Sequence, residues 1–199
     1  MSYIFLSMFQ SENFSTFNLY LQLGIEHILP NGLDHILFIV GIFLLSSKFK
    51  HIFWEVSTFT IAHTLTLALS TKGLFHVSPA IVEPIISFSI LFICIENILT
   101  SKFRYYRLIF IFSFGLIHGL GFANTLSIIN MDNAYFLISL IGFNVGVEIG
   151  QLIVIGICFM TIGLWFSKKE WYKKRITVPI SIVISIIALY WTIERIFFN

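Results

Sequence analysis

The chain consists almost entirely of long apolar stretches separated by short polar interruptions. A helix needs about 20 apolar residues to cross the hydrocarbon core of a bilayer. Six windows reach or approach that length: residues 32–47, 52–71, 79–100, 107–129, 134–166 and 177–197. No polar block between them is long enough to form a soluble domain. We therefore predict one membrane domain over residues 1–199, an all-α polytopic bundle of about six transmembrane helices.

The first window is interrupted on its N-terminal side. The segment before it, FNLYLQLGIEHIL, is also apolar, and Pro30, Asn31 and Gly32 separate the two. Because proline and glycine interrupt helices, we predict a broken first helix. Residues 1–31 would form an extracytoplasmic N-terminal segment and half-helix, and residues 32–197 the transmembrane bundle. The fifth window exceeds the thickness of a bilayer, so its helix should tilt or project into the cytoplasm.

The basic residues predict the orientation, because Lys and Arg concentrate on the cytoplasmic side of membrane proteins. Most of them fall after the first, third and fifth windows: Lys48, Lys50, Lys102, Arg104, Arg107, Lys168, Lys169, Lys173, Lys174 and Arg175. Lys72 and Arg195 fall at the other ends of the predicted helices. We therefore expect both termini to be extracytoplasmic.

The composition agrees with a membrane location. Hydrophobic residues make up 57% of the chain and charged residues 11%, against about a quarter charged in soluble domains. The lipid bilayer is thus the expected surrounding, and a net charge of +2 gives no reason to expect nucleic acid. Cys94 and Cys158 lie inside apolar windows, where packing is a more typical role than a disulfide or a thiolate metal site.

Ionisable side chains inside the windows are the candidates for function. A charge in hydrocarbon is costly, so each needs a partner, water or a metal ion. The set comprises Asp34, His35, His63, Glu83, Glu96, His118 and Glu148, with Glu26 and His27 just before the first window. We expect no intramembrane Lys or Arg to neutralise these acids, so the cluster should attract a cation or protons. Imidazole and carboxylate ligands favour Ni, Co, Zn, Mn or Fe(II) over Cu(I).

Depth along the helices divides this set. At 1.5 Å per residue, most members lie in the extracytoplasmic half or near the middle, and could line one cavity open to the outside. Glu96 lies near the cytoplasmic end, where it could serve as an inner gate, or could hydrogen-bond locally beside Asn97.

The fifth window carries two stripes at helical spacing. Asn144, Glu148 and Gln151 form a polar face, and Gly142, Gly146 and Gly150 form a small-residue ridge on another face. Such a ridge suits close packing against another helix, including that of a second copy in a homo-oligomer.

Five segments of the chain carry a family resemblance: GIEHILPNGLDHILFIVGIFLL, TFTIAHTLTLAL, VEPIISFSILFICIEN, FGLIHGLGFA and FNVGVEIGQL. In this order they resemble the membrane-only branch of the HupE/UreJ family of hydrogenase and urease accessory proteins, over about residues 21–197. The resemblance implies a nickel permease or nickel-related accessory protein of the bacterial inner membrane. The ligand candidates that the resemblance implies are His27, Asp34, His35, His63, His118 and Glu148. Glu83 is a further candidate because of its depth along the third window.

Two other functions suit the same residues. Three histidines and an acid can hold a zinc ion with one open position, so the chain could be an intramembrane metal-dependent hydrolase of lipids or amides. Glu83 or Glu148 would then be the general base. A lateral cleft filled by lipid would favour this hydrolase, and a continuous polar path past Glu96 would favour transport. A metal-sensing or accessory subunit would instead show a closed site.

The chain also contains a weak internal similarity. ILFICIENIL in the third window aligns with ALYWTIERIF in the sixth, with Glu96 over Glu194. Two three-helix halves must have inverted topology, an arrangement found in transporters with their sites at the repeat interface. A 3+3 inverted repeat is therefore a further hypothesis about the fold.

Overall fold

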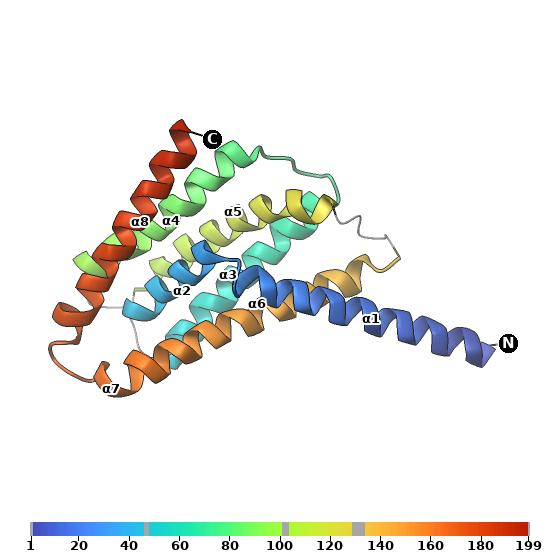
Figure 1. The fold of residues 1–199 in the computed structure, drawn as a ribbon, viewed down its shortest axis with the longest axis horizontal. Helices are drawn as coiled ribbons and strands as arrows, with labels where there is room; N and C mark the ends of the chain where they lie inside the picture. The colour runs from blue at the N-terminus through green and yellow to red at the C-terminus, as the bar shows by residue number, and fades with distance from the viewer. Residues whose placement is uncertain (1, 46–47, 101–103, 129–133, 199) are drawn as a thin grey trace.

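The computed structural model describes residues 2–45, 48–100, 104–128 and 134–198 (Figure 1). Lys102, one of the predicted cytoplasmic residues, lies outside them. All regular structure in these ranges is helical, as predicted. The elements are α1 (Ser2–Ile28), α2 (Leu33–Leu45), α3 (Phe49–Thr71), α4 (Pro79–Leu99), α5 (Tyr106–Ile128), α6 (Phe136–Cys158), the π-helix η1 (Phe159–Gly163), α7 (Leu164–Phe166), the π-helix η2 (Lys173–Thr177) and α8 (Val178–Phe197).

The helices account for the predicted spans. Four of them are long and apolar enough to cross a membrane: Phe49–Thr71, Pro79–Leu99, Phe136–Phe166 and Lys173–Phe197. The bent pair Glu12–Ile28 and Leu33–Leu45 makes a fifth when it is counted as one span. Tyr106–Gly121 is a shorter apolar helix within α5. Together these elements confirm a bundle of about six transmembrane helices. The orientation and the inverted repeat stay predictions.

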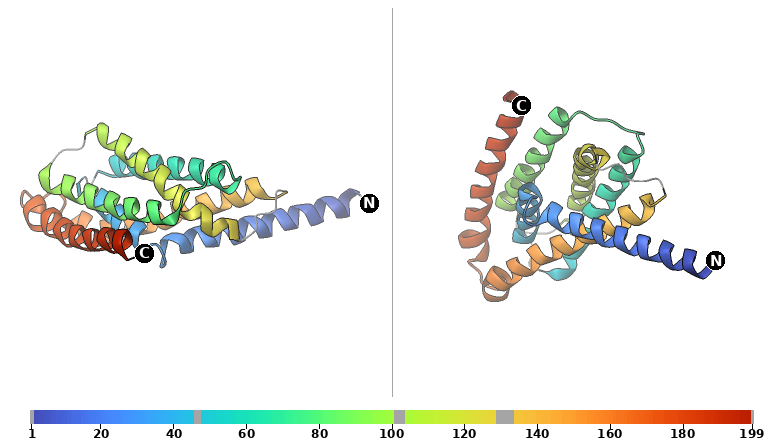
Figure 2. Two further views of the ribbon diagram at one scale, coloured as in Figure 1. Left: turned by 90° about the horizontal axis from the view of Figure 1, so that it is seen from above. Right: turned by 45° about the vertical axis from the view of Figure 1, so that its right-hand side comes forward.

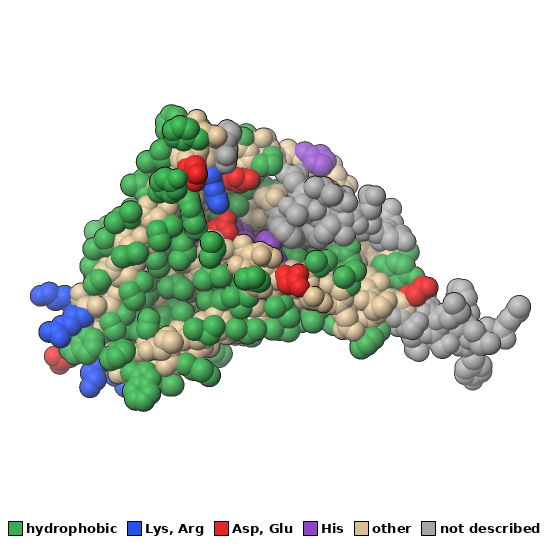
Figure 3. All heavy atoms as spheres, in the orientation of Figure 1, with side chains coloured by type: hydrophobic (Ala, Val, Ile, Leu, Met, Phe, Trp, Pro, Cys, Tyr) green, Lys and Arg blue, Asp and Glu red, His purple; other side chains and the backbone are tan. Residues whose placement is uncertain are grey.

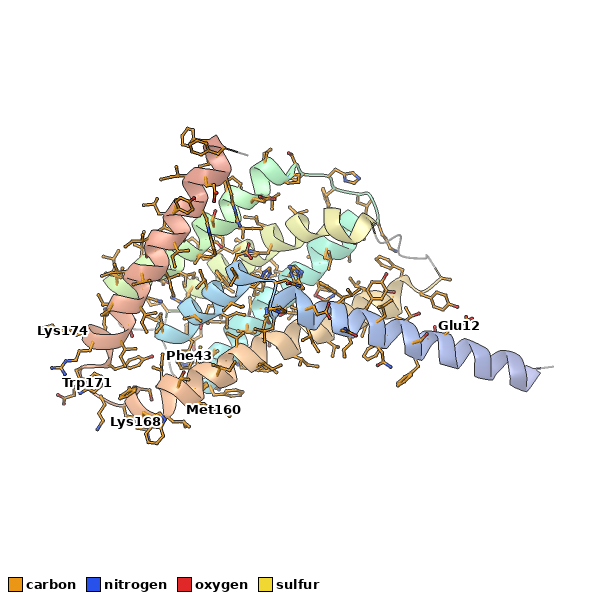
Figure 4. All side chains as sticks on the ribbon, viewed as in Figure 1. Glu12, Phe43, Met160, Lys168, Trp171 and Lys174 are labelled. Atoms are coloured by element: carbon orange, nitrogen blue, oxygen red, sulfur yellow. The ribbon has the colours of Figure 1, made fainter. Side chains whose placement is uncertain are left out.

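The predicted break in the first helix is confirmed. α1 ends at Ile28, α2 begins at Leu33, and the two axes differ by 69° across the segment that holds Pro30 and Gly32. The part before the break differs from the predicted half-helix, because α1 is one continuous helix of 27 residues. Its N-terminal part projects beyond the other helices, and Figure 4 places Glu12 on it (Figures 2 and 4).

The glycine ridge of α6 packs against α1 of the same chain. A Cβ atom added to Gly146 would lie 2.1 Å from the Leu21 carbonyl oxygen, and Gly142 and Gly150 similarly meet Phe17 and Ile28. The two helices run in the same direction and in close contact, as small-residue ridges allow. Since α1 covers this face, the ridge leaves no room for a second copy of the chain.

Basic side chains gather at one end of the bundle. Figure 4 places Lys168, Trp171 and Lys174 at the turn between α7 and α8, and Figure 3 shows Lys and Arg atoms grouped there beside a largely hydrophobic surface. We call this the basic end. α8 runs from it to the opposite end, where α4 begins beside the last turn of α8. The short helix α2 lies among α3, α4, α6 and α8 and carries part of the core.

Candidate metal site

Four histidines from four helices meet where the first helix breaks. His27 ends α1, His35 lies in the first turn of α2, and His63 and His118 come from α3 and α5. The ring centroid of His35 is 4.6 Å from that of His27, 5.0 Å from that of His118 and 6.1 Å from that of His63. The break makes this possible, because it turns α2 so that His35 faces the end of α1. We call these four residues the histidine cluster.

Three members of the cluster, His35, His63 and His118, are buried, and their ring nitrogens make few hydrogen bonds to the described residues. The exposed fractions of His35, His63 and His118 are 6%, 0% and 1%. His118 Nδ1 lies 2.9 Å from the Phe114 carbonyl oxygen, and His35 Nδ1 lies 3.9 Å from Asp34 Oδ1. Among the described residues, His118 Nε2 and both ring nitrogens of His35 and His63 have no hydrogen-bond partner. An unpaired buried polar atom costs about 1–3 kcal/mol, and native proteins contain few of them. These nitrogens are therefore available to a ligand.

The spacing of the rings suits a single metal ion. With metal–nitrogen distances of about 2.0–2.1 Å, two imidazoles on one ion have ring centroids about 4.5–6.3 Å apart, depending on the angle between them. The spacings of His35 from the other three rings, and that of His27 from His63, lie between 4.6 and 6.1 Å and fall within that range. The nitrogens do not yet converge, since no three His, Cys, Asp or Glu side chains among the described residues form a ready metal-binding group. Ligation would require the rings to turn.

A cavity of about 380 Å³ leads to the cluster. Its lining comprises His27, Asn31, Gly32, Asp34, His35, Glu83, Ile86, His118, Gly121 and Arg195. Arg195 in the last turn of α8 reaches into it, with Nη2 3.5 Å from Asp34 Oδ2 and Nη1 donating a hydrogen bond of 3.0 Å to the Glu83 carbonyl oxygen. Figure 3 shows acidic, basic and histidine atoms close together in a hollow of this face. Asp34 thus has a basic partner, contrary to the expectation that the acids lack one.

A layer of phenylalanines follows on the side of the basic end. Phe38, Phe59 and Phe114 lie about one helical turn from His35, His63 and His118 respectively, and all three are buried. The rings of Phe59 and Phe38 approach that of His118 at centroid distances of 4.9 and 5.6 Å. This phenylalanine layer lies between the histidine cluster and Glu96. It interrupts the polar path that an open transport route would show.

Glu96 belongs to a buried ion-pair network rather than to an open passage. Arg107 Nη1 is 2.5 Å from Glu96 Oε2, and Arg107 Nε is 2.5 Å from Glu55 Oε1. The Arg107 side chain is fully buried, although the sequence suggested a cytoplasmic loop residue. The expectation that no intramembrane Lys or Arg neutralises the acids is therefore wrong here as well. Helical spacing could have indicated that Arg107 faces the interior, because it lies eleven residues, or about three turns, before His118 on the same face.

The structure does not bring Glu148 to the histidines. The predicted polar stripe of α6 does lie on one face, where it hydrogen-bonds to α3: Ser57 donates to Glu148 at 3.3 Å, Thr60 to Gln151 at 2.9 Å, and Thr64 to Asn144 at 2.5 Å. Glu148 lines a separate groove of about 300 Å³ with Thr64 and Asn144. The cavity brings together five of the residues predicted from the sequence: His27, Asp34, His35, Glu83 and His118. His63 does not line the cavity, but its ring is 6.1 Å from that of His35, which does.

These features define a class of protein: a polytopic helical membrane protein with a buried histidine cluster at a helix break, reached through a cavity lined by Asp34, Glu83 and Arg195. Residues 6–195 match the family model described as HupE / UreJ protein, so the chain belongs to the HupE/UreJ family. The HupE/UreJ family is a family of hydrogenase and urease accessory membrane proteins, and it is associated with the handling of nickel or cobalt. No curated protein and no solved structure matches the chain.

Proposed function

We propose that the protein is a permease for a divalent transition metal ion, nickel in keeping with its family, and that the ion binds at the histidine cluster. One observation carries the proposal: the buried nitrogens of His35, His63 and His118 that find no hydrogen-bond partner in the described part of the chain. Neutral imidazole is a common ligand of Ni, Zn, Cu and Fe, and the cluster contains no thiolate that would favour Cu(I).

The cavity supplies a route to the cluster. A cation that enters from the opposite end, which we predict to be extracytoplasmic, first meets Asp34 and the Glu83 side chain. Asp34 exchanges its contact with Arg195 for the cation, and the ion then passes to His35 and its neighbours. Release toward the basic end requires the phenylalanine layer to move. This arrangement supports our proposal of a carrier whose site opens on one side at a time.

The number of histidines favours transport over hydrolysis. Catalytic zinc sites use three protein ligands and keep the fourth position for water or substrate. Four imidazoles around one ion would fill a tetrahedral shell and leave no position for the nucleophile. Of the two candidate bases, Glu83 of α4 lines the cavity, but Glu148 of α6 lines a separate groove. These points support a binding and transfer role.

Metal analysis of the purified full-length protein tests the proposal. The wild-type protein, incubated with nickel and desalted, should retain the ion, and His63→Ala should lose it. His76→Ala is the matched control, because His76 is an exposed residue of the segment between α3 and α4. Nickel uptake into vesicles should disappear when His63 and His118 are both changed to Ala. Retention of bound nickel and of uptake in that double variant would overturn the proposal.

A further inference from the structure

The Arg107 network, comprising Glu55, Glu96 and Arg107, joins three helices. Glu55 comes from α3, Glu96 from α4 and Arg107 from α5, and Asn97 accepts a further hydrogen bond of 3.3 Å from Arg107. Asn97 Nδ2 in turn donates a hydrogen bond of 2.7 Å to the Gly41 carbonyl oxygen of α2 and lies 3.4 Å from the Ser181 hydroxyl oxygen of α8. Three helices therefore meet at the guanidinium group of Arg107, and Asn97 connects two more, α2 and α8, to the network. All of these contacts lie close to the basic end.

The charges of this network do not balance. It holds two carboxyl groups and one guanidinium, which stays protonated in proteins. Asn97, Gly41 and Ser181 bring no charge, and the nearby Cys94 of α4 is a buried free thiol. Two other basic groups lie nearby at the basic end: Arg104 lines a groove with Glu96, and Lys173 donates a hydrogen bond of 2.7 Å to the Thr100 carbonyl oxygen. Within the described part of the chain, the ion pairs of Glu55 and Glu96 involve Arg107 alone. Two ionised carboxylates would thus leave an uncompensated negative charge in a buried site, which is strongly unfavourable.

Two buried atoms of the network point to an additional ligand. Within residues 2–45, 48–100, 104–128 and 134–198, Glu55 Oε2 and Arg107 Nη2 have no hydrogen-bond partner, and Glu55 is fully buried. An ionised carboxylate can only accept hydrogen bonds, whereas a protonated carboxyl group can also donate one. A single proton would therefore balance the charge of the network and change the hydrogen-bonding capacity of its oxygens.

Glu96 offers the route by which a proton would arrive. Its exposed fraction is 9%, against 0% for Glu55, and it lines a groove of about 400 Å³ between α4 and α5. The other polar members of the groove, Thr100 and Arg104, lie at the basic end. On the far side, the phenylalanine layer separates the network from the histidine cluster. Proton exchange can therefore take place without involving the candidate metal ligands.

We propose that Glu55 and Glu96 share one exchangeable proton, held beside Arg107 and taken up from the basic end of the bundle. In the binding step one carboxylate oxygen accepts a proton from a hydronium ion of the solvent, which leaves as water, and the negative charge of that carboxylate is removed. Such a proton is a species that a carrier can exchange for a cation moving through the same bundle, a role that rests on the proposed function.

Infrared spectroscopy of the full-length protein in lipid nanodiscs, at neutral pH and without added metal, tests the site. The wild-type protein should show the C=O stretching band of a protonated carboxyl group. Glu55→Gln alone and Glu96→Gln alone should each remove the same one-proton contribution, because the remaining carboxylate then pairs one to one with Arg107. Arg107→Gln should instead enlarge the band to two protons. The control Glu170→Gln, an exposed residue at the basic end, should leave it unchanged.

The two single glutamine variants keep the network neutral, so they decide the matter even if Arg107→Gln does not fold. A band that persists unchanged in both would place the proton elsewhere and overturn the proposal, as would the absence of any band that they remove. Because no metal is present, these outcomes are independent of nickel retention. A protein that binds nickel but lacks the shared proton would contradict this inference alone.

Discussion

Two buried polar regions lie on opposite sides of the phenylalanine layer, and they differ in how their polar atoms are satisfied. In the histidine cluster, ring nitrogens of three residues lack hydrogen-bond partners among the residues that the structure describes, and a cavity reaches the rings. In the Arg107 network, one guanidinium contacts two carboxylates and an amide and ties together three helices. The comparison shows that buried charge alone does not locate a ligand site. A metal site is indicated more specifically by several neutral ligand nitrogens that lack partners among the described residues and lie beside a cavity, whereas the unpaired atoms of the Arg107 network belong to charged groups already held in ion pairs.

The largest expected effect is on stability and concerns the Arg107 network. Arg107→Gln should lower the free energy of unfolding by about 3–5 kcal/mol, because it leaves two buried carboxyl groups without their cation. Denaturant unfolding in detergent measures this change. Adding Glu55→Gln and Glu96→Gln should restore most of the loss, since no buried carboxyl group then has to be protonated in order to stay neutral. A loss below about 1 kcal/mol for Arg107→Gln would mean that the network contributes no more than a surface ion pair.

The next largest effect is on metal binding and concerns His35. Its ring neighbours those of the other three histidines, so His35→Ala should weaken nickel binding at least about 100-fold, or about 2.7 kcal/mol. Isothermal titration calorimetry measures the affinity, and His76→Ala should match the wild-type protein. The free energy of unfolding should change less than in Arg107→Gln, because His35 has few partners to lose. If His35→Ala bound nickel as tightly as the wild-type protein, the histidine cluster would not be the metal site, and it would not differ in this respect from the Arg107 network.

A smaller and opposite effect is expected at Arg195. Arg195→Gln should free Asp34 and remove a positive charge from the cavity, so nickel binding should strengthen about fivefold, in line with the ~1 kcal/mol of a partly exposed ion pair. The gain should shrink at high salt, because screening already weakens the charge of Arg195. Titration of Arg195→Gln beside Glu194→Gln, its neighbour in the same turn, separates this effect from general changes at the end of α8. Weaker binding would show that Arg195 supports the site instead of competing with the cation.

The spans and the helix break could be predicted from the sequence, because apolar length and the Pro30–Gly32 segment act locally. The four clustered histidines were all among the candidates, since an intramembrane histidine is rare and easily noticed. Their arrangement around His35 could not be predicted, because it depends on the 69° bend and on how each helix is rotated. The sequence indicated that α6 had a polar face but not which helix that face would contact.

Arg107 and Arg195 were misjudged for the same physical reason. Each lies near the edge of an apolar window, where a basic residue is usually a solvated loop charge. A long side chain can reach several ångströms back into the bundle, and only the position of its partner shows whether it does. For Arg107 the partners are Glu55 and Glu96, and for Arg195 the partner is Asp34. Glu55 was missed because it lies in the first turn of the window 52–71, close to Lys48 and Lys50, where a carboxylate is usually in contact with solvent.

The smallest expected effect concerns Glu148, which the sequence suggested as a ligand and the structure places between α6 and α3. Glu148→Gln should change nickel affinity by less than about twofold, and should cost about 0.6 kcal/mol of stability, as expected for one interhelical hydrogen bond. Glu83→Gln is the matched comparison, because Glu83 lines the cavity and its loss should weaken nickel binding several-fold. Calorimetric titration of the two variants side by side measures the difference. If Glu148→Gln lowered affinity as much as His35→Ala, α6 would have to rotate during binding, and the polar stripe would belong to the metal route after all.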